Sequence, residues 1–127
     1  MHNLQIFGNT FTEIKKDKIR NVYRYFNQNF GDDMPTIMAN TILGFNLFVK
    51  KTKPDLIVVH GDRPETLACA CVGSFQNIKV AHIEGGEISG TIDELIRHAV
   101  SKMSHIHMTS NAKAKKRLIQ MGEKKKN

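Results

Sequence analysis

The sequence contains no tryptophan, only two cysteines and no long apolar run among its 127 residues. A membrane-spanning helix needs at least about 18 consecutive apolar residues, whereas the strongest run here covers only 56–59. No apolar segment typical of a secretory signal follows Met1. These absences predict a soluble, cytoplasmic protein without a membrane partner.

The two cysteines, Cys69 and Cys71, stand two positions apart in an apolar stretch. This spacing does not suit a disulfide within a helix, and the further ligand pairs that a zinc site needs are missing. We therefore expect both to be small core residues in a reducing compartment. A redox role is the alternative.

The formal net charge of +7 is concentrated at one end of the chain. After residue 110 there are seven basic residues and one acid, giving +6, so the first 110 residues carry only +1. A basic last helix with a lysine-rich tail is typical of a solvated surface, and no aromatic residues alternate with these charges to stack on bases. The sequence therefore predicts no nucleic-acid partner.

Hydrophobic periodicity divides the chain into alternating helices and strands without any linker or internal repeat. Residues 1–127 are accordingly interpreted as one domain. Leu4, Ile6 and Phe7 could belong to a strand, and 12–28 has imperfect helical spacing. The clearer expected elements are helices over 33–53, 64–75, 91–103 and 110–122, with strands over 55–59, 78–83 and 105–109.

This alternation predicts parallel strands joined by right-handed crossovers, which is an α/β fold with a Rossmann-like, three-layer sheet. The strand at 55–59 is continuously apolar, a pattern typical of a strand that is covered on both faces. In such sheets the ligand binds beyond the carboxyl ends of the strands. Unusual polar residues follow two of the expected strands, at 60–63 and at 84–87.

We expect these polar residues to converge on one crevice, where crowded carboxylates suit proton transfer. Each has an ordinary alternative: Asp62 as a helix N-cap, Asp93 as a first-turn charge and His82 as a core histidine. Glu84 has no evident capping partner, since it ends a strand and precedes two glycines. The candidate residues are Asp62, Glu84 and Asp93, with Arg63, Arg97, His60, His82 and His98.

The glycine-containing loop that follows the second strand would let the backbone approach a ligand closely. Gly85 and Gly86 begin this loop, and Ser89 to Thr91 would present free N–H groups to a phosphate or sugar oxygen at a helix start. Thr91 and Glu94 have the spacing of a capping box, in which Glu94 bonds back to Thr91. The alternative is a plain long turn.

Four segments, His60-Gly61-Asp62-Arg63, AHIEGGE at 81–87, SGTIDE at 89–94 and IRH at 96–98, closely resemble the hydrolysing UDP-N-acetylglucosamine 2-epimerases. The resemblance is to the branch that makes N-acetylmannosamine for sialic acid, runs over 53–122 and extends weakly back to 8–10. It implies part of the N-terminal half of a glycosyltransferase-B type fold, in which a UDP-sugar binds between two Rossmann-like halves.

The reaction implied by the resemblance is elimination of UDP to a glycal and hydration to N-acetylmannosamine, with no cofactor or metal and with a homo-oligomeric full-length enzyme. The resemblance makes Asp62, Glu84 and Asp93 the acid/base carboxylates. It gives Arg63 and Arg97 the orientation or charge neutralisation of the substrate. The remaining implied substrate-binding residues are His60, His82, Gly85, Gly86, Ser89 and His98.

Family members are much longer than this chain, so the resemblance also predicts a truncated N-terminal domain whose independent activity is undetectable. One alternative within the lineage is an epimerase for a UDP-linked diacetamido sugar of the legionaminic acid route. Another is an inactive remnant that only folds or binds. From a different class, a metal-dependent hydrolase would use His60, Asp62, His82, Glu84 and His98 as ligands.

Overall fold

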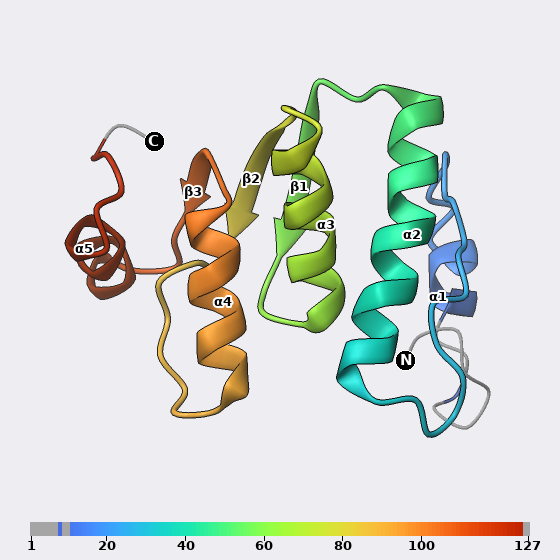
Figure 1. Ribbon diagram of the computed structural model, residues 1–127, viewed down its shortest axis with the longest axis horizontal. Coiled ribbons are helices and arrows are strands. Elements are labelled where there is room, and N and C mark those ends of the chain that lie inside the picture. The colour runs from blue at the N-terminus through green and yellow to red at the C-terminus, as the bar shows by residue number, and fades with distance from the viewer. Residues whose placement is uncertain (1–7, 9–10, 126–127) are drawn as a thin grey trace.

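The protein, a computed structural model that describes residues 8 and 11–125, is a parallel three-stranded sheet with a row of helices along it (Figure 1). The predicted α/β class with parallel strands is therefore confirmed. In chain order the elements are α1 (Phe11–Lys16), α2 (Met34–Thr52), β1 (Leu56–His60), α3 (Pro64–Phe75), β2 (Lys79–Ile83), α4 (Ile92–Lys102), β3 (Ile106–Met108) and α5 (Ala112–Gln120).

Local signals in the sequence define the ends of α2. The side chain of Asp33 accepts a hydrogen bond from the Thr36 amide, and Pro35 occupies the first turn, where its missing N–H leaves no bond unmade. The helix ends where Lys53 adopts a left-handed conformation. Pro54 follows directly and could not continue the helical hydrogen bonding.

The sheet has the strand order β1-β2-β3, and both pairings are parallel. His60 at the end of β1 pairs with Ile83 of β2, and Ile83 pairs in turn with Met108 of β3. All three strands therefore end at the same level. The loops that follow them start side by side at one edge of the sheet, which we call the carboxyl edge.

The core lies between one face of the sheet and helices α2, α3 and α4, which stand next to one another in Figure 1. Gly73 allows α3 to pack closely on β2, because an added Cβ there would lie 2.6 Å from Cγ2 of Val80. The buried apolar side chains of this core are Val49, Ile57, Val59, Ala70, Val72, Val80, Ile96 and Val100.

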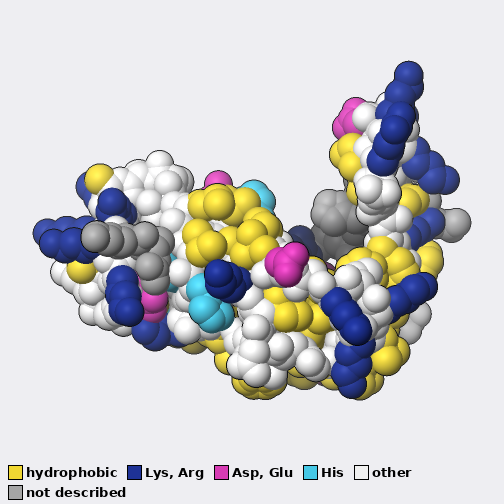
Figure 2. All heavy atoms as spheres, turned by 90° about the horizontal axis from the view of Figure 1, so that it is seen from above, with side chains coloured by type: hydrophobic (Ala, Val, Ile, Leu, Met, Phe, Trp, Pro, Cys, Tyr) yellow, Lys and Arg dark blue, Asp and Glu magenta, His cyan; other side chains and the backbone are white. Residues whose placement is uncertain are grey.

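The opposite face of β1 is open among the described residues, so the expectation that this strand is covered on both faces is wrong for them. Leu56 and Val58 are 42% and 54% exposed, while Ile57 and Val59 between them are buried. Leu95 on α4 is another apolar side chain outside the core, and it is 66% exposed. Figure 2 shows hydrophobic side chains gathered near the middle of the visible surface.

The N-terminal segment differs most from its sequence pattern. The helix expected over 12–28 is formed only as α1, because the backbone of Lys18 and of Asn21 turns left-handed. The chain then runs along α2, where the Asn27 side chain donates a 2.9 Å hydrogen bond to Oγ1 of Thr41. The strand suggested at residues 4–7 lies outside the described residues.

Candidate active site

The carboxyl edge carries an imidazole and a carboxylate in direct contact. Nε2 of His60, the last residue of β1, lies 2.9 Å from Oε2 of Glu84, the first residue after β2. Glu84 has a left-handed backbone, with φ of 65°, and its amide donates to the Met108 carbonyl. The two side chains are 64% and 55% exposed, so this pair is open to a ligand from solvent.

A second pair, Asp62 with Arg97, lies deeper at the same edge. The Arg97 guanidinium donates from Nη2 to Oδ2 of Asp62 and from Nη1 to the Glu87 carbonyl at 3.0 Å. The side chains of Arg97 and Asp62 are only 10% and 26% exposed. Asp62 is therefore not the N-cap of α3, a position held by Arg63 without a side-chain cap bond.

His82 does not reach the surface at all. It is completely buried, its Nδ1 lies 3.0 Å from Oγ of Ser101, and its Nε2 lies 2.8 Å from the Gly61 carbonyl. Burial lowers the pKa of this imidazole below its ordinary value, which favours the neutral ring. This placement favours the core-histidine interpretation over contact with a ligand.

The loop after β2 is held in place by side chains from α5 and from the two residues that precede this helix. The Arg117 guanidinium donates to the Gly86 carbonyl, and the Glu87 carboxylate accepts from Oγ of Ser110 and from the side-chain Nδ2 of Asn111. Gly86 has φ of 81°, and a Cβ there would lie 2.5 Å from the Ala114 carbonyl oxygen. Both the backbone angle and the close packing favour glycine.

The amides expected to be free at the start of α4 are occupied. Oε2 of Glu94 accepts hydrogen bonds from the Ser89 amide at 2.9 Å and from the Gly90 amide at 2.8 Å. These two backbone bonds lower the pKa of Glu94. Thr91 is the N-cap residue by position but makes no side-chain cap bond, so the predicted capping box is replaced by this longer reach of Glu94.

Three other predicted residues join neither the His60–Glu84 pair nor the Asp62–Arg97 pair. Arg63 is exposed, with Nε 3.5 Å from Oε2 of Glu65. Asp93 accepts a 3.3 Å hydrogen bond from Oγ1 of Thr91. His98 has a buried Nε2 without a hydrogen-bond partner among the described residues.

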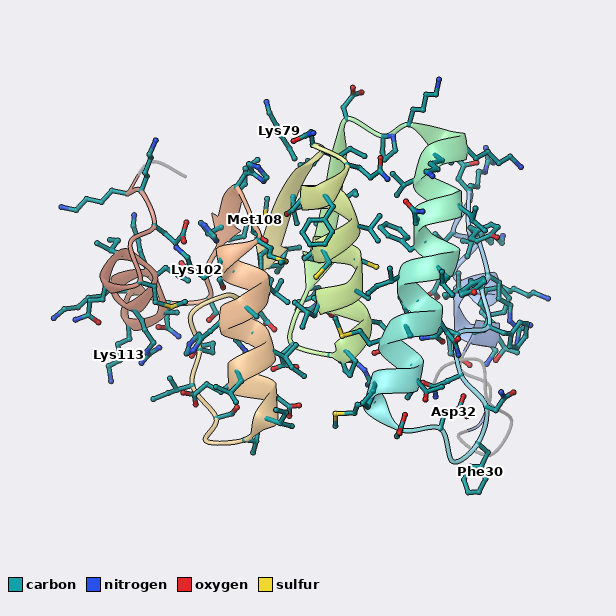
Figure 3. The ribbon with its side chains drawn as sticks, viewed as in Figure 1. Phe30, Asp32, Lys79, Lys102, Met108 and Lys113 are labelled. Atoms are coloured by element: carbon teal, nitrogen blue, oxygen red, sulfur yellow. The ribbon has the colours of Figure 1, made fainter. Side chains whose placement is uncertain are left out.

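The sequence patterns missed two residues that support this edge. The charge pattern predicts that Arg117 belongs to a solvated basic surface, but its side chain bonds to the Gly86 carbonyl. Lys113 does point outward, as Figure 3 shows. Helical spacing was the available signal, because Arg117 lies three residues after buried Ala114. Ser101 was missed in the same way, four residues after Arg97 on the buried side of α4.

Other predicted features can be placed just as plainly. The thiols of Cys69 and Cys71 are free and half-buried, and burial raises the pKa of Cys69 to about 12, which makes it a poor nucleophile. Within the described part of the chain, no three His, Cys, Asp or Glu side chains come together as metal ligands, including those of the metal-hydrolase alternative. No described helix is long and apolar enough to cross a membrane.

The arrangement can move protons and hold an anion. A hydrogen-bonded imidazole and carboxylate, as in His60 and Glu84, can pass a proton to or from a bound molecule. Arg97 brings a positive charge close to Asp62 and to the loop after β2. The carboxyl edge thus combines acid/base groups with the held guanidinium of Arg97 and with the glycine-containing loop after β2.

The whole chain, residues 1–127, matches the family described as UDP-N-acetylglucosamine 2-epimerase. It is 44% identical over 126 residues to "UDP-N-acetylglucosamine 2-epimerase" of Neisseria meningitidis serogroup B, covering 99% of this chain and 33% of that protein. It is 41% identical over 128 residues to "UDP-N,N'-diacetylbacillosamine 2-epimerase (hydrolyzing)" of Legionella pneumophila, covering 98% of this chain and 34% of the relative.

Solved structures give the same result for the fold. The crystal structure of UDP-GlcNAc 2-epimerase from Neisseria meningitidis bound to UDP-GlcNAc superposes with a TM-score of 0.84 at 23% identity, covering 92% of this chain and 33% of that one. UDP-GlcNAc 2-epimerase from Methanocaldococcus jannaschii gives 0.77 at 26% identity, covering 92% and 34%. The chain thus spans about a third of the length of the relatives it matches. The prediction that it forms part of a fold of glycosyltransferase-B type is confirmed.

Proposed function

Because the chain belongs to the UDP-N-acetylglucosamine 2-epimerase family, we propose that its carboxyl edge forms one wall of a hydrolysing 2-epimerase site. In that reaction a base removes the proton at C2 of the sugar while UDP leaves C1, which gives a glycal. Water then adds its oxygen to C1 and a proton returns to C2, so that N-acetylmannosamine and UDP are released.

The observation that carries this proposal is the open His60–Glu84 pair at the ends of β1 and β2. Its half-exposed carboxylate is accessible to a sugar, and the neighbouring imidazole can exchange its proton. We assign Glu84 an acid/base role on this ground. A pair that served only stability would contribute little at such exposure, where ion pairs are worth about 0–1 kcal/mol.

Asp62 and Arg97 have a related but less exposed role in the proposal. The buried guanidinium keeps a positive charge at the carboxyl edge, where it would neutralise part of a diphosphate. A ligand phosphate that bonds to Arg97 would release Asp62 for proton transfer. Arg63, which is exposed at the same loop, would orient the substrate, and Asp93 would complete the set of three acids.

The sugar is the point on which a second candidate remains. The Neisseria relative is named for UDP-N-acetylglucosamine, and the Legionella relative is named for UDP-N,N'-diacetylbacillosamine, at similar identities. We favour UDP-N-acetylglucosamine as the substrate and N-acetylmannosamine, a precursor of nonulosonic acids, as the product. A chain that binds only the diacetamido sugar would reverse this choice.

Binding is tested by titrating the isotope-labelled 127-residue chain with UDP-N-acetylglucosamine and following the amide resonances. We expect weak binding, with shifts concentrated at 60–63 and 84–87. The matched control is Lys113→Gln on the exposed side of α5, which should bind equally. Shifts confined to other parts of the chain, or none at millimolar ligand, would overturn the proposed site.

Turnover is tested with the same chain in D₂O, by following UDP and C2-deuterated N-acetylmannosamine by NMR. We expect no detectable product, because the described edge is one open wall and positioning a substrate between two walls contributes about 7–11 kcal/mol to lowering a barrier. Steady product formation above that of a Glu84→Gln chain would contradict this expectation. Measurable product that both chains form at the same rate would remove Glu84 from the mechanism.

A further inference from the structure

A buried chain of hydrogen bonds runs through the core behind the carboxyl edge. It starts at Ser101 on α4, passes through the ring of His82 on β2 and ends at the Gly61 carbonyl in the loop after β1. Ser101 and His82 are both completely buried. These hydrogen bonds therefore connect α4, β2 and the loop after β1 through two side chains that have no contact with solvent.

The chemistry of the three groups fixes the direction of each bond. The Gly61 carbonyl oxygen can only accept, so Nε2 of His82 carries the proton and donates. In a neutral ring Nδ1 is then an acceptor, and the Ser101 hydroxyl must donate to it. Removing the hydroxyl would leave a buried Nδ1 without a partner, which is unfavourable.

Two loops of the site meet this buried chain. Gly61 immediately precedes Asp62, and its amide also donates to the Ile83 carbonyl at 3.1 Å. On the other side, a Cβ on Gly85 would lie 2.8 Å from Oγ of Ser101 and 2.9 Å from Nδ1 of His82. The position of the imidazole thus affects the loop that carries Asp62 and the loop that follows Glu84.

We propose that Ser101 is a positioning residue of the site: its hydroxyl holds the His82 ring so that Nε2–H reaches the Gly61 carbonyl, and this bond sets the place of Asp62. It touches no ligand itself and acts through His82. The consequence for ligand binding rests on the proposed function, whereas the consequence for the ring and the loop does not.

The experiment compares Ser101→Ala with Ser104→Ala in the 127-residue chain. Ser104 is a fitting control, because it lies two residues beyond the end of α4, is 8% exposed and donates its hydroxyl hydrogen bond to the Val100 carbonyl. Nitrogen-15 NMR of the histidine rings reports the tautomer of His82. Amide hydrogen exchange reports the loop at Gly61.

In the wild-type chain we expect His82 to be neutral at pH 7 with the proton on Nε2. Ser101→Ala should shift the Nδ1 resonance and speed exchange of the Gly61 amide about 10-fold or more, since a buried acceptor loses its donor. Ser104→Ala should leave both unchanged. Gly85→Ala, which presses on the same two groups, should reproduce the change if Ser101→Ala does not fold.

A wild-type His82 with its proton on Nδ1 would overturn the proposal, whatever the variants do. So would Gly61 exchange that changes equally in Ser101→Ala and Ser104→Ala. Titration with UDP-N-acetylglucosamine separates this result from the proposed function. If the wild-type chain fails to bind, the proposed function fails while the ring and exchange data still decide the role of Ser101; if it binds, Ser101→Ala should bind several-fold more weakly.

Discussion

Replacing Arg97 with methionine should destabilise the protein far more than the loss of an ordinary ion pair. Methionine keeps much of the side-chain volume, so the main change is electrostatic. It removes the guanidinium that bonds to Asp62 and to the Glu87 carbonyl. The carboxylate of Asp62, only 26% exposed, is then left without its cation.

The expected magnitude follows from this burial. Removing one partner of a fully buried pair costs about 3–5 kcal/mol, and the partial exposure of Asp62 lets water recover some of that loss. We therefore expect Arg97→Met to lower the free energy of unfolding by about 2–4 kcal/mol. The exposed pair of Lys16 and Glu13, at 70% and 61% exposure, provides the comparison, and Lys16→Met should cost no more than about 0.5 kcal/mol.

Urea unfolding followed by circular dichroism at pH 7 measures these differences directly. The double variant Arg97→Met with Asp62→Asn should recover part of the stability, because it removes the stranded charge together with its partner. The reasoning is refuted if Arg97→Met loses no more stability than Lys16→Met. It is also refuted if the two substitutions at the pair are simply additive.

Three further outcomes are expected. Burial lowers the pKa of His82 in the folded chain below 6.5, so the unfolded chain binds the proton first as the pH falls. The free energy of unfolding should therefore decrease as the pH drops below about 6.5, by at most about 1.4 kcal/mol per pH unit from this group. This dependence should be smaller in His82→Gln when unfolding is measured across pH. Gly86→Ala should cost about 2–4 kcal/mol in urea unfolding through clash and backbone strain, whereas Gly90→Ala, with φ of 71° and open space around it, should cost only about 1–2. Arg117→Gln should speed hydrogen exchange over 85–90 while Lys116→Gln leaves it unchanged, and equal exchange in both would refute the role given to Arg117.

The central part of the fold follows from the sequence because local and long-range signals agree there. α2 has a capping aspartate, an early proline and a stop at Lys53-Pro54, and the structure uses all of them. Over 12–28 the apolar residues have imperfect helical spacing, but the helix ends early because Lys18 turns left-handed after α1. Periodicity predicts which residues face a core and cannot show that a helix is interrupted at a polar residue.

The sequence predicts that polar residues gather at one edge of the sheet, but it does not predict which of them contact one another. Polar residues at the carboxyl ends of parallel strands are expected to converge, and His60 does lie near Glu84 and Asp62 near Arg97. The partner choices within that edge were not readable, because several donors and acceptors compete at similar distances. Glu94 accepts hydrogen bonds from the Ser89 and Gly90 amides, whereas the helix-start pattern predicts that these amides are free to bind a ligand.

At Glu84 the left-handed backbone lowers the stability of the fold, while the proposed function needs the side chain at this position. For a residue with a Cβ that conformation is unfavourable by about 1–2 kcal/mol, and glycine would avoid this destabilisation. Optimising the chain for thermal stability alone would therefore favour replacing the carboxylate to which we assign the acid/base role. Substitutions meant to stabilise this chain should leave position 84 unchanged and address the open face of β1, where Leu56 and Val58 contribute exposed apolar surface.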